Sequence, residues 1–139
     1  MAQGTLSVVR MKFPQSLVPV DWKIVEDVAP QRGEIDLELV EILKSGEGCI
    51  NGEEMVWRAR GTLNANLGLD DSEIVLRNQH LLPEDYRSFY IPFPGTVLGD
   101  QAGRRRVAFL YFGDVQWHRH FPFFSQDFYG YVRLLRPRQ

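Results

Sequence analysis

The run VAFLYF, residues 107–112, constrains the fold more than any other stretch of the sequence. Every position is apolar or aromatic, so both faces of a strand built from it need to be covered. One face would carry Val107, Phe109 and Tyr111, and the other would carry Ala108, Leu110 and Phe112. We therefore predict that this run forms a central strand and anchors the core.

Shorter segments separated by turn residues predict further strands. They cover residues 5–13, 53–63, 74–82, 115–121 and 128–135. Residues 33–44 fit a helix or a strand by their apolar spacing. We predict a strand there, because no N-cap residue precedes Glu34 and a turn-rich segment follows. The pair Asn51 and Gly52 is typical of a tight hairpin turn, since both residues tolerate positive φ.

Other segments fit helices, loops and connections. A short helix could begin at Asp21 and end before Pro30, although the same residues could form an irregular strand. Residues 82–89 predict one or two helical turns. We expect a loop at residues 64–73 and a turn at 99–103. Pro92 and Pro94 cannot donate to a strand ladder, so residues 90–95 are expected at a sheet edge or in a connection.

These predictions together indicate a mainly β chain, an antiparallel sandwich or partly open barrel with one or two short helices. A length of 139 residues corresponds to one domain, spanning residues 1–139. The longest apolar run is far below the roughly 20 residues of a membrane-spanning helix. With a single cysteine the chain forms no internal disulfide, and we expect a soluble protein of the cytoplasm or of a particle assembled there.

Charge is distributed unevenly along the chain. Residues 1–103 hold 9 basic and 16 acidic side chains (net −7), while residues 104–139 hold 7 and 2 (net +5), which together give the overall −2. The basic C-terminal strands could simply lie beside the acidic N-terminal ones. The same difference could instead support head-to-tail association between copies or with a partner.

His118 and His120 lie two residues apart in a predicted strand, so they would share one face. A metal site would need a third ligand, and His80 is the remaining histidine. The alternatives are two ordinary polar strand residues or a pH-sensitive contact. No cofactor is expected, and a metal-dependent β-barrel enzyme that uses these histidines is the first alternative to the function predicted below.

Arg104, Arg105 and Arg106 could contact phosphates, which gives a nucleic-acid-binding module as a second alternative. A pI near 5.9 argues against it. No G-x-S-x-G or Walker motif occurs, so an enzyme is less probable than a binding protein. A solvated hairpin end explains the arginine run equally well.

The last third of the chain is rich in aromatic residues, which are preferred anchors of protein interfaces. We predict a non-enzymatic structural or assembly protein, for example a small subunit of a viral or phage particle, which binds protein partners or its own copies. The candidate interface residues are Trp117, Arg119, Phe121, Phe123, Tyr129, Tyr131, Arg136 and Arg138.

Overall fold

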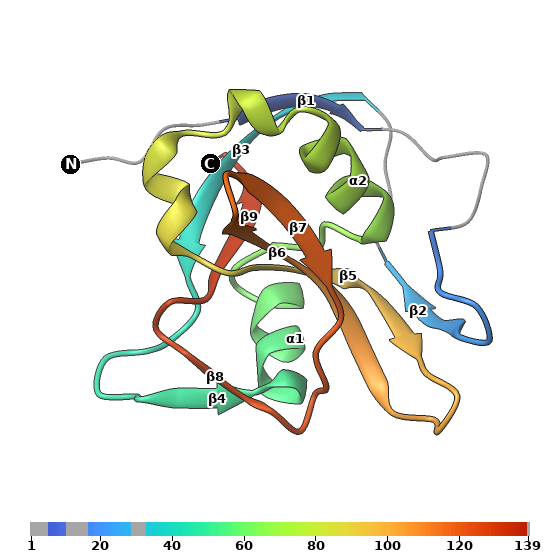
Figure 1. Ribbon diagram of the computed structural model, residues 1–139. Helices are drawn as coiled ribbons and strands as arrows, with labels where there is room; N and C mark the ends of the chain where they lie inside the picture. Colours follow the sequence, from blue (N-terminus) through green and yellow to red (C-terminus); the bar gives the residue numbers. More distant parts are fainter. Residues whose placement is uncertain (1–5, 11–16, 29–32, 139) are drawn as a thin grey trace.

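The most apolar segment of the chain lies inside a sheet, as predicted. In the computed structural model, β6 (Arg105–Gly113) pairs with β5 (Ile91–Gly99) on one side and with β7 (Gln116–His120) on the other. β2 (Lys23–Asp27) completes this antiparallel sheet in the order β2-β5-β6-β7 (Figure 1). The structure describes residues 6–10, 17–28 and 33–138.

Two smaller antiparallel sheets complete the β structure. One contains β1 (Leu6–Arg10), β3 (Gly33–Glu41) and β9 (Arg133–Pro137) in the order β1-β3-β9. The other pairs β4 (Cys49–Asn51) with β8 (Asp127–Tyr129). The predicted mainly β class is confirmed, and the described strands form open sheets without a closed barrel.

Two helices lie on opposite sides of strands β5 and β6, α1 (Gly52–Arg60) and α2 (Leu69–Arg77) (Figure 1). Leu110 and Ala108 of β6 belong to the core cluster that also contains Ile74 and Val75 of α2. The alternate residues of β6 belong to a second cluster. It contains Val107 and Phe109 together with Met55, Val56, Ala59, Phe124 and Phe128. The sheet therefore separates two cores, each closed by one helix.

Helix α1 replaces the hairpin and the strand that we predicted at residues 51–63, so those two predictions are wrong. The Asn51 side chain caps the helix by accepting from the Glu54 backbone N–H at 2.9 Å. Strand alternation would bury Trp57, but this side chain is 76% exposed. Met55, Val56 and Ala59 instead form the buried stripe of a helix. The helix also needs a glycine at 52, because a Cβ there would lie 2.6 Å from Phe124 Cα.

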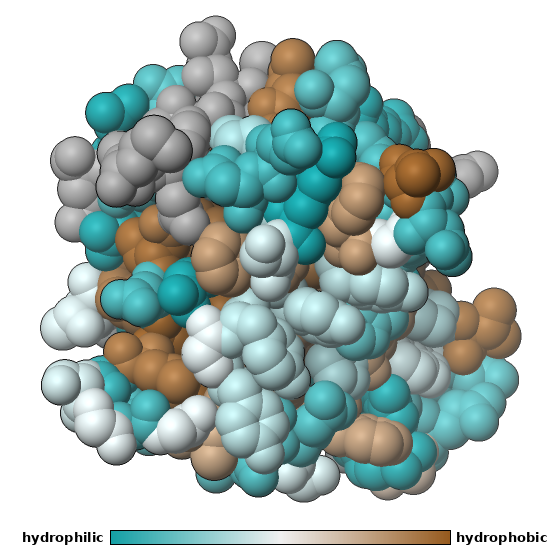
Figure 2. Space-filling model, turned by 60° about the vertical axis from the view of Figure 1, so that its left-hand side comes forward, coloured by the Kyte–Doolittle hydropathy of each residue, from teal (hydrophilic) through white to brown (hydrophobic). Residues whose placement is uncertain are grey.

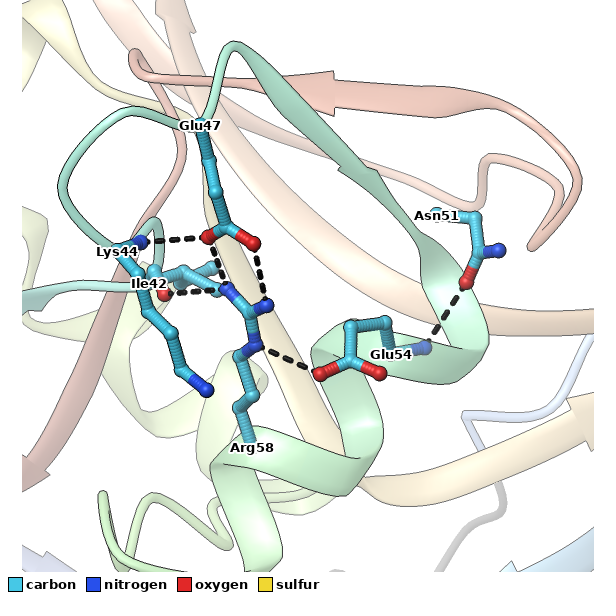
Figure 3. A network of polar contacts seen from close by, with 6 residues as sticks. All are labelled: Ile42, Lys44, Glu47, Asn51, Glu54 and Arg58. Atoms are coloured by element: carbon cyan, nitrogen blue, oxygen red, sulfur yellow. Dashed lines mark hydrogen bonds and ion pairs between the residues drawn. The ribbon is translucent and has the colours of Figure 1, made fainter.

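Arg58 ties α1 to the loop that precedes β4 (Figure 3). Its guanidinium donates two hydrogen bonds to Glu47, at 2.6 and 2.7 Å, and one to Glu54 at 2.7 Å. The Arg58 hydrogen bonds lower the pKa of Glu47 to about 2. It also donates to the Ile42 carbonyl at 3.2 Å, which places the end of β3 beside the helix.

Helix α2 and the 3₁₀ turn η1 (Gln79–Leu81) occupy residues that we predicted as a loop followed by a strand, which is also wrong. The Asp71 carboxylate accepts from the Gly68 backbone N–H at 2.8 Å and so satisfies a donor at the helix start. The helical turns predicted at residues 82–89 are confirmed by η2 (Glu84–Ser88). None of the helices in the described residues is long and apolar enough to cross a membrane.

The strand predicted over residues 33–44 is confirmed by β3. Of the two alternatives given for the segment after Asp21, the irregular strand is confirmed by β2, whose register shifts between Ile24 and Glu26, and the helix is wrong. β5 is a buried interior strand, although an edge or connection was expected for its first residues. Its prolines are tolerated because β2 pairs only with residues 96–99, so Pro92 and Pro94 lie beyond that ladder.

Candidate functional site

The β6–β7 hairpin places two histidines and a tyrosine on one face of the sheet. Tyr111 pairs with His118 and Phe109 pairs with His120 in the antiparallel ladder. The Tyr111 ring contacts both histidine rings, with its centroid 5.3 Å from that of His118 and 4.9 Å from that of His120. The prediction that both histidines share a face is therefore confirmed.

A backbone bridge between two sheets brings a second tyrosine to this face. Tyr90 forms a parallel bridge with Val132, in which the Tyr90 N–H donates to the Tyr131 carbonyl at 2.9 Å. The Tyr90 ring stacks on Tyr111 at 5.6 Å and meets Tyr131 edge-on at 5.3 Å. Tyr129 extends the group, at 6.1 Å from Tyr131.

We call these six residues the Tyr–His surface. It consists of Tyr90, Tyr111, His118, His120, Tyr129 and Tyr131. It holds four of the five tyrosines of the chain, and the fifth, Tyr86, is buried in the core. On the face shown in Figure 2, pale side chains of intermediate hydropathy, the range that includes tyrosine, gather across the middle.

A small pocket opens within the Tyr–His surface. It has a volume of about 30 Å³ and is lined by Tyr90, Phe109, His120, Pro122, Phe128 and Tyr131, among others. Phe109 stacks on Phe128 at 5.1 Å beneath the exposed rings. The pocket is large enough for a water molecule or the terminal group of one side chain, and too small for a typical drug-sized ligand.

The imidazole of His120 lines this pocket and contains a buried polar nitrogen. Its Nε2 is buried and has no hydrogen-bond partner in the described part of the chain. Burial lowers the pKa of His120, so the neutral imidazole is the stable form at neutral pH. An unpartnered buried nitrogen is costly, and a bound group with matching hydrogen-bonding capacity would remove that cost.

The histidines do not form a metal centre with other described residues. His118 Nε2 lies 2.9 Å from the Gly113 carbonyl oxygen, so this ring is held by its own hairpin. His80 lies on η1, outside the Tyr–His surface. Within residues 6–10, 17–28 and 33–138, no three His, Cys, Asp or Glu side chains are grouped so that they could hold a metal ion.

Most of the predicted interface residues serve the fold. Trp117 is buried, and Arg119 donates to Glu73 of α2 at 2.9 Å. Phe121 packs edge-on against Trp22 at 5.3 Å, and Arg136 pairs with Glu38 at 3.0 Å. Arg138 is exposed at the end of β9, and Phe123 lies under the guanidinium groups of Arg104 and Arg106. Of the predicted set, Tyr129 and Tyr131 belong to the Tyr–His surface.

The arginine run after the β5–β6 turn is paired within the molecule. Arg104 and Arg106 both contact Asp100, at 3.0 and 2.7 Å. Arg105 contacts Glu53 at 2.8 Å and Glu26 at 3.5 Å. Phosphates would have to compete with these carboxylates, so the geometry gives no support to a nucleic-acid site at this turn.

The charge difference between the two parts of the chain is balanced inside the fold. Six arginines of residues 104–139 pair with carboxylates of the preceding part. They are Arg104, Arg105, Arg106, Arg119, Arg133 and Arg136. The expectation that basic C-terminal strands lie beside acidic N-terminal ones is thus confirmed, and this charge difference does not itself require a second molecule.

The sequence alone did not indicate Tyr90 or Tyr111 as surface residues. Tyr111 belongs to the most apolar run and was assigned to the core face of its strand, where Val107 and Phe109 are buried. The change from phenylalanine to tyrosine along that face, opposite two histidines, is the signal that marks the end of the covered part. Tyr90 reaches the surface through the bridge to Val132, for which no local pattern exists.

The chain matches no protein-family model, and no similar curated protein or solved structure was found. Its function is therefore inferred from the chemistry of the Tyr–His surface. That surface offers aromatic ring faces, tyrosine hydroxyls and one unpartnered imidazole nitrogen. These groups suit binding through ring contacts and hydrogen bonds.

Proposed function

We propose that the protein is a non-enzymatic binding subunit that holds a protein partner against the Tyr–His surface, within a larger assembly. The observation that carries this proposal is the difference in solvent exposure between the tyrosine and phenylalanine side chains. Every phenylalanine in the described part of the chain is buried or half-buried, whereas three tyrosines of the surface are exposed. A core built only for stability does not require that its tyrosines be the exposed aromatic residues.

Tyrosine is the aromatic residue expected where a ring must be wet before binding and buried afterwards. Its hydroxyl remains solvated in the free protein, and its rigid ring loses little conformational freedom on binding. Tyr90, Tyr129 and Tyr131 are 39, 47 and 45% exposed. Such rings are enriched among the few residues that supply most of the binding energy of an interface.

A partner of a different sequence is favoured over self-association. The paired arginines leave no large charge difference to drive copies together, as described above. Self-association is a separate outcome that native mass spectrometry of the untagged protein would detect by mass. A mixture of oligomers that is unaffected by substitution of the tyrosines would mean that copies meet elsewhere.

Affinity capture with three baits tests the proposal. The baits are the wild-type protein, Tyr131→Ala and Trp57→Ala, the last removing a more exposed aromatic ring on α1. We expect wild type and Trp57→Ala to retain the same partner and Tyr131→Ala to lose at least about tenfold of it, the loss typical of an interface anchor. Circular dichroism and urea unfolding would show that Tyr131→Ala remains folded. Capture that depends on Trp57 but not on Tyr131 would overturn the proposal.

A further inference from the structure

We propose that the partner inserts a basic side chain, arginine or lysine, into the Tyr–His surface, an inference that rests on the proposed function. Two exposed carboxylates that lack an ion-pair partner among the described residues support this inference. Residues 104–139 contain two acidic residues, Asp114 and Asp127, and both are exposed. Neither forms an ion pair with another described residue, although the basic residues around them are largely paired.

The two carboxylates flank the Tyr–His surface. Asp114 lies in the β6–β7 turn, directly after Gly113, whose carbonyl oxygen contacts His118. Asp127 begins β8 and alternates with Phe128, so it shares the exposed face of that strand with Tyr129. A carboxylate therefore stands at the hairpin end of the surface and another beside its outer tyrosine.

The neighbouring cation is not available to neutralise these carboxylates. Arg133, two residues after Tyr131, donates to the Gly130 carbonyl and to Glu41, and its guanidinium lies 4.7 Å from the centre of the Phe89 ring. The surface thus combines aromatic rings with unpaired negative charge. A partner with a positive side chain complements both features, because cations are attracted to tyrosine ring faces as well as to carboxylates.

The pocket agrees with a basic side chain in size and in hydrogen bonding. Its volume of about 30 Å³ suits an ammonium group or the edge of a guanidinium. In the tautomer that leaves His120 Nε2 unprotonated, this nitrogen can accept a hydrogen bond from the inserted group. His120 is held neutral by burial, so it does not repel a cation.

Other occupants leave more groups without a partner. An acidic side chain would be repelled by Asp114 and Asp127. A proline ring would pack on the tyrosines but would satisfy neither carboxylate nor His120 Nε2. A basic side chain can donate to His120 Nε2 and is attracted by the negative charge of both carboxylates.

Nuclear magnetic resonance of ring-labelled tyrosine tests the inference without a known partner. The probes are the capped amides N-acetyl-arginine amide and N-acetyl-lysine amide, compared with N-acetyl-proline amide, N-acetyl-glutamate amide and sodium chloride at equal ionic strength. We expect saturable shifts of the Tyr90, Tyr111 and Tyr131 rings with the two basic probes alone. The Tyr86 ring, which is buried in the core, should not move and serves as the internal reference.

Matched charge variants show whether the carboxylates are responsible. The double variant Asp114→Asn and Asp127→Asn should weaken binding of the basic probes about fivefold, as expected for two exposed ion pairs. Asp21→Asn also removes a carboxylate, but Asp21 is bonded to Gln101 at the opposite end of the sheet, and this control should bind as wild type does. Equal affinity in the double variant, or preference for the proline or glutamate probe, would overturn the inference. Affinity capture that still depends on Tyr131 would then leave the proposed function intact.

Discussion

One face of the β6–β7 hairpin is buried and the other is partly exposed, although both are built from alternating residues of the same strands. Leu110 and Trp117 point toward α2 and are buried, and Arg119 on that face pairs with Glu73 of the helix. Tyr111 and His118 point the other way and remain partly exposed. Strand alternation thus assigns residues to faces, whereas the covering elements decide which face becomes core.

The second face is covered only along part of its length. Helix α1 and Phe128 close it over Val107 and Phe109, which are buried. Two residues after Phe109, β6 carries Tyr111, which α1 and Phe128 do not bury. The second core thus ends beside the pocket, which has buried Phe109 and Phe128 at its base and exposed tyrosines at its rim.

Truncation of neighbouring residues on the two faces should give the largest difference in stability. Leu110→Ala should lower the free energy of unfolding by about 2–5 kcal/mol, because it leaves a cavity in a closed core. Tyr111→Ala should cost about 1–2 kcal/mol, because its ring contacts are open to solvent. Urea unfolding followed by circular dichroism measures both. Equal losses would mean that the Tyr–His surface is part of the core.

Substitution at Gly52 tests how closely α1 must approach the second face. Gly52→Ala should destabilise the protein by about 1–3 kcal/mol, because the added Cβ would clash with the Phe124 backbone at 2.6 Å. Gly48→Ala is the matched control, since a Cβ there meets nothing within 4 Å. Thermal and urea unfolding of the pair should differ clearly. A neutral Gly52→Ala would contradict the close packing of α1 against residue 124.

Substitution of polar residues on the two faces should give a smaller difference in stability than substitution of the apolar ones. Arg119→Gln should cost about 1–2 kcal/mol, because it removes a charged hydrogen bond to the half-buried Glu73. His118→Gln should cost less than about 1 kcal/mol, since a glutamine can still donate to the Gly113 carbonyl. Denaturant midpoints measured under identical conditions give the difference. A larger loss for His118→Gln would show that its ring stacking with Tyr111 is a main support of the hairpin.

The smallest expected effect is the pH dependence that His120 adds. Burial lowers the pKa of His120 in the folded protein, so the unfolded chain binds this proton at higher pH. Its contribution to stability is therefore present above the usual histidine pKa, near 6.5, and decreases as the pH falls through the folded value. Between pH 7 and pH 5, His120→Gln should lose stability less steeply than wild type in urea titrations. Parallel curves would show that His120 is protonated equally in both states.

Local patterns predicted part of the fold for identifiable reasons. The alternation in β3, β6 and β7 survives because each of these strands buries at least one face, and period-two patterns report that burial. At residues 52–60 a strand was predicted, and at residues 69–77 the end of a loop and the start of a strand, and both predictions were wrong. In the first case the helix packs Met55, Val56 and Ala59 into a core that includes Phe124, far along the chain.

The candidate site was also predicted only in part from the sequence. His118, His120, Tyr129 and Tyr131 could be picked from the sequence because they lie close together in an aromatic segment. Their assignment to one surface required the β4–β8 pair, which joins residues about 80 positions apart, and the bridge at Tyr90, which joins residues about 40 positions apart. Trp117 and Arg119 are equally prominent in the sequence, but Trp117 packs in the core beside α2 and Arg119 pairs with Glu73 of that helix.

The amino-acid pattern therefore determined the mainly β character, the central position of residues 107–112 and the shared face of the two histidines, since each depends on alternation within a few residues. Tertiary structure alone decided that this face is open beyond Phe109, that Tyr90 joins it, and that six C-terminal arginines pair with carboxylates while Asp114 and Asp127 form no ion pair with a described residue. These outcomes depend on contacts between distant segments, whose energies no local pattern contains.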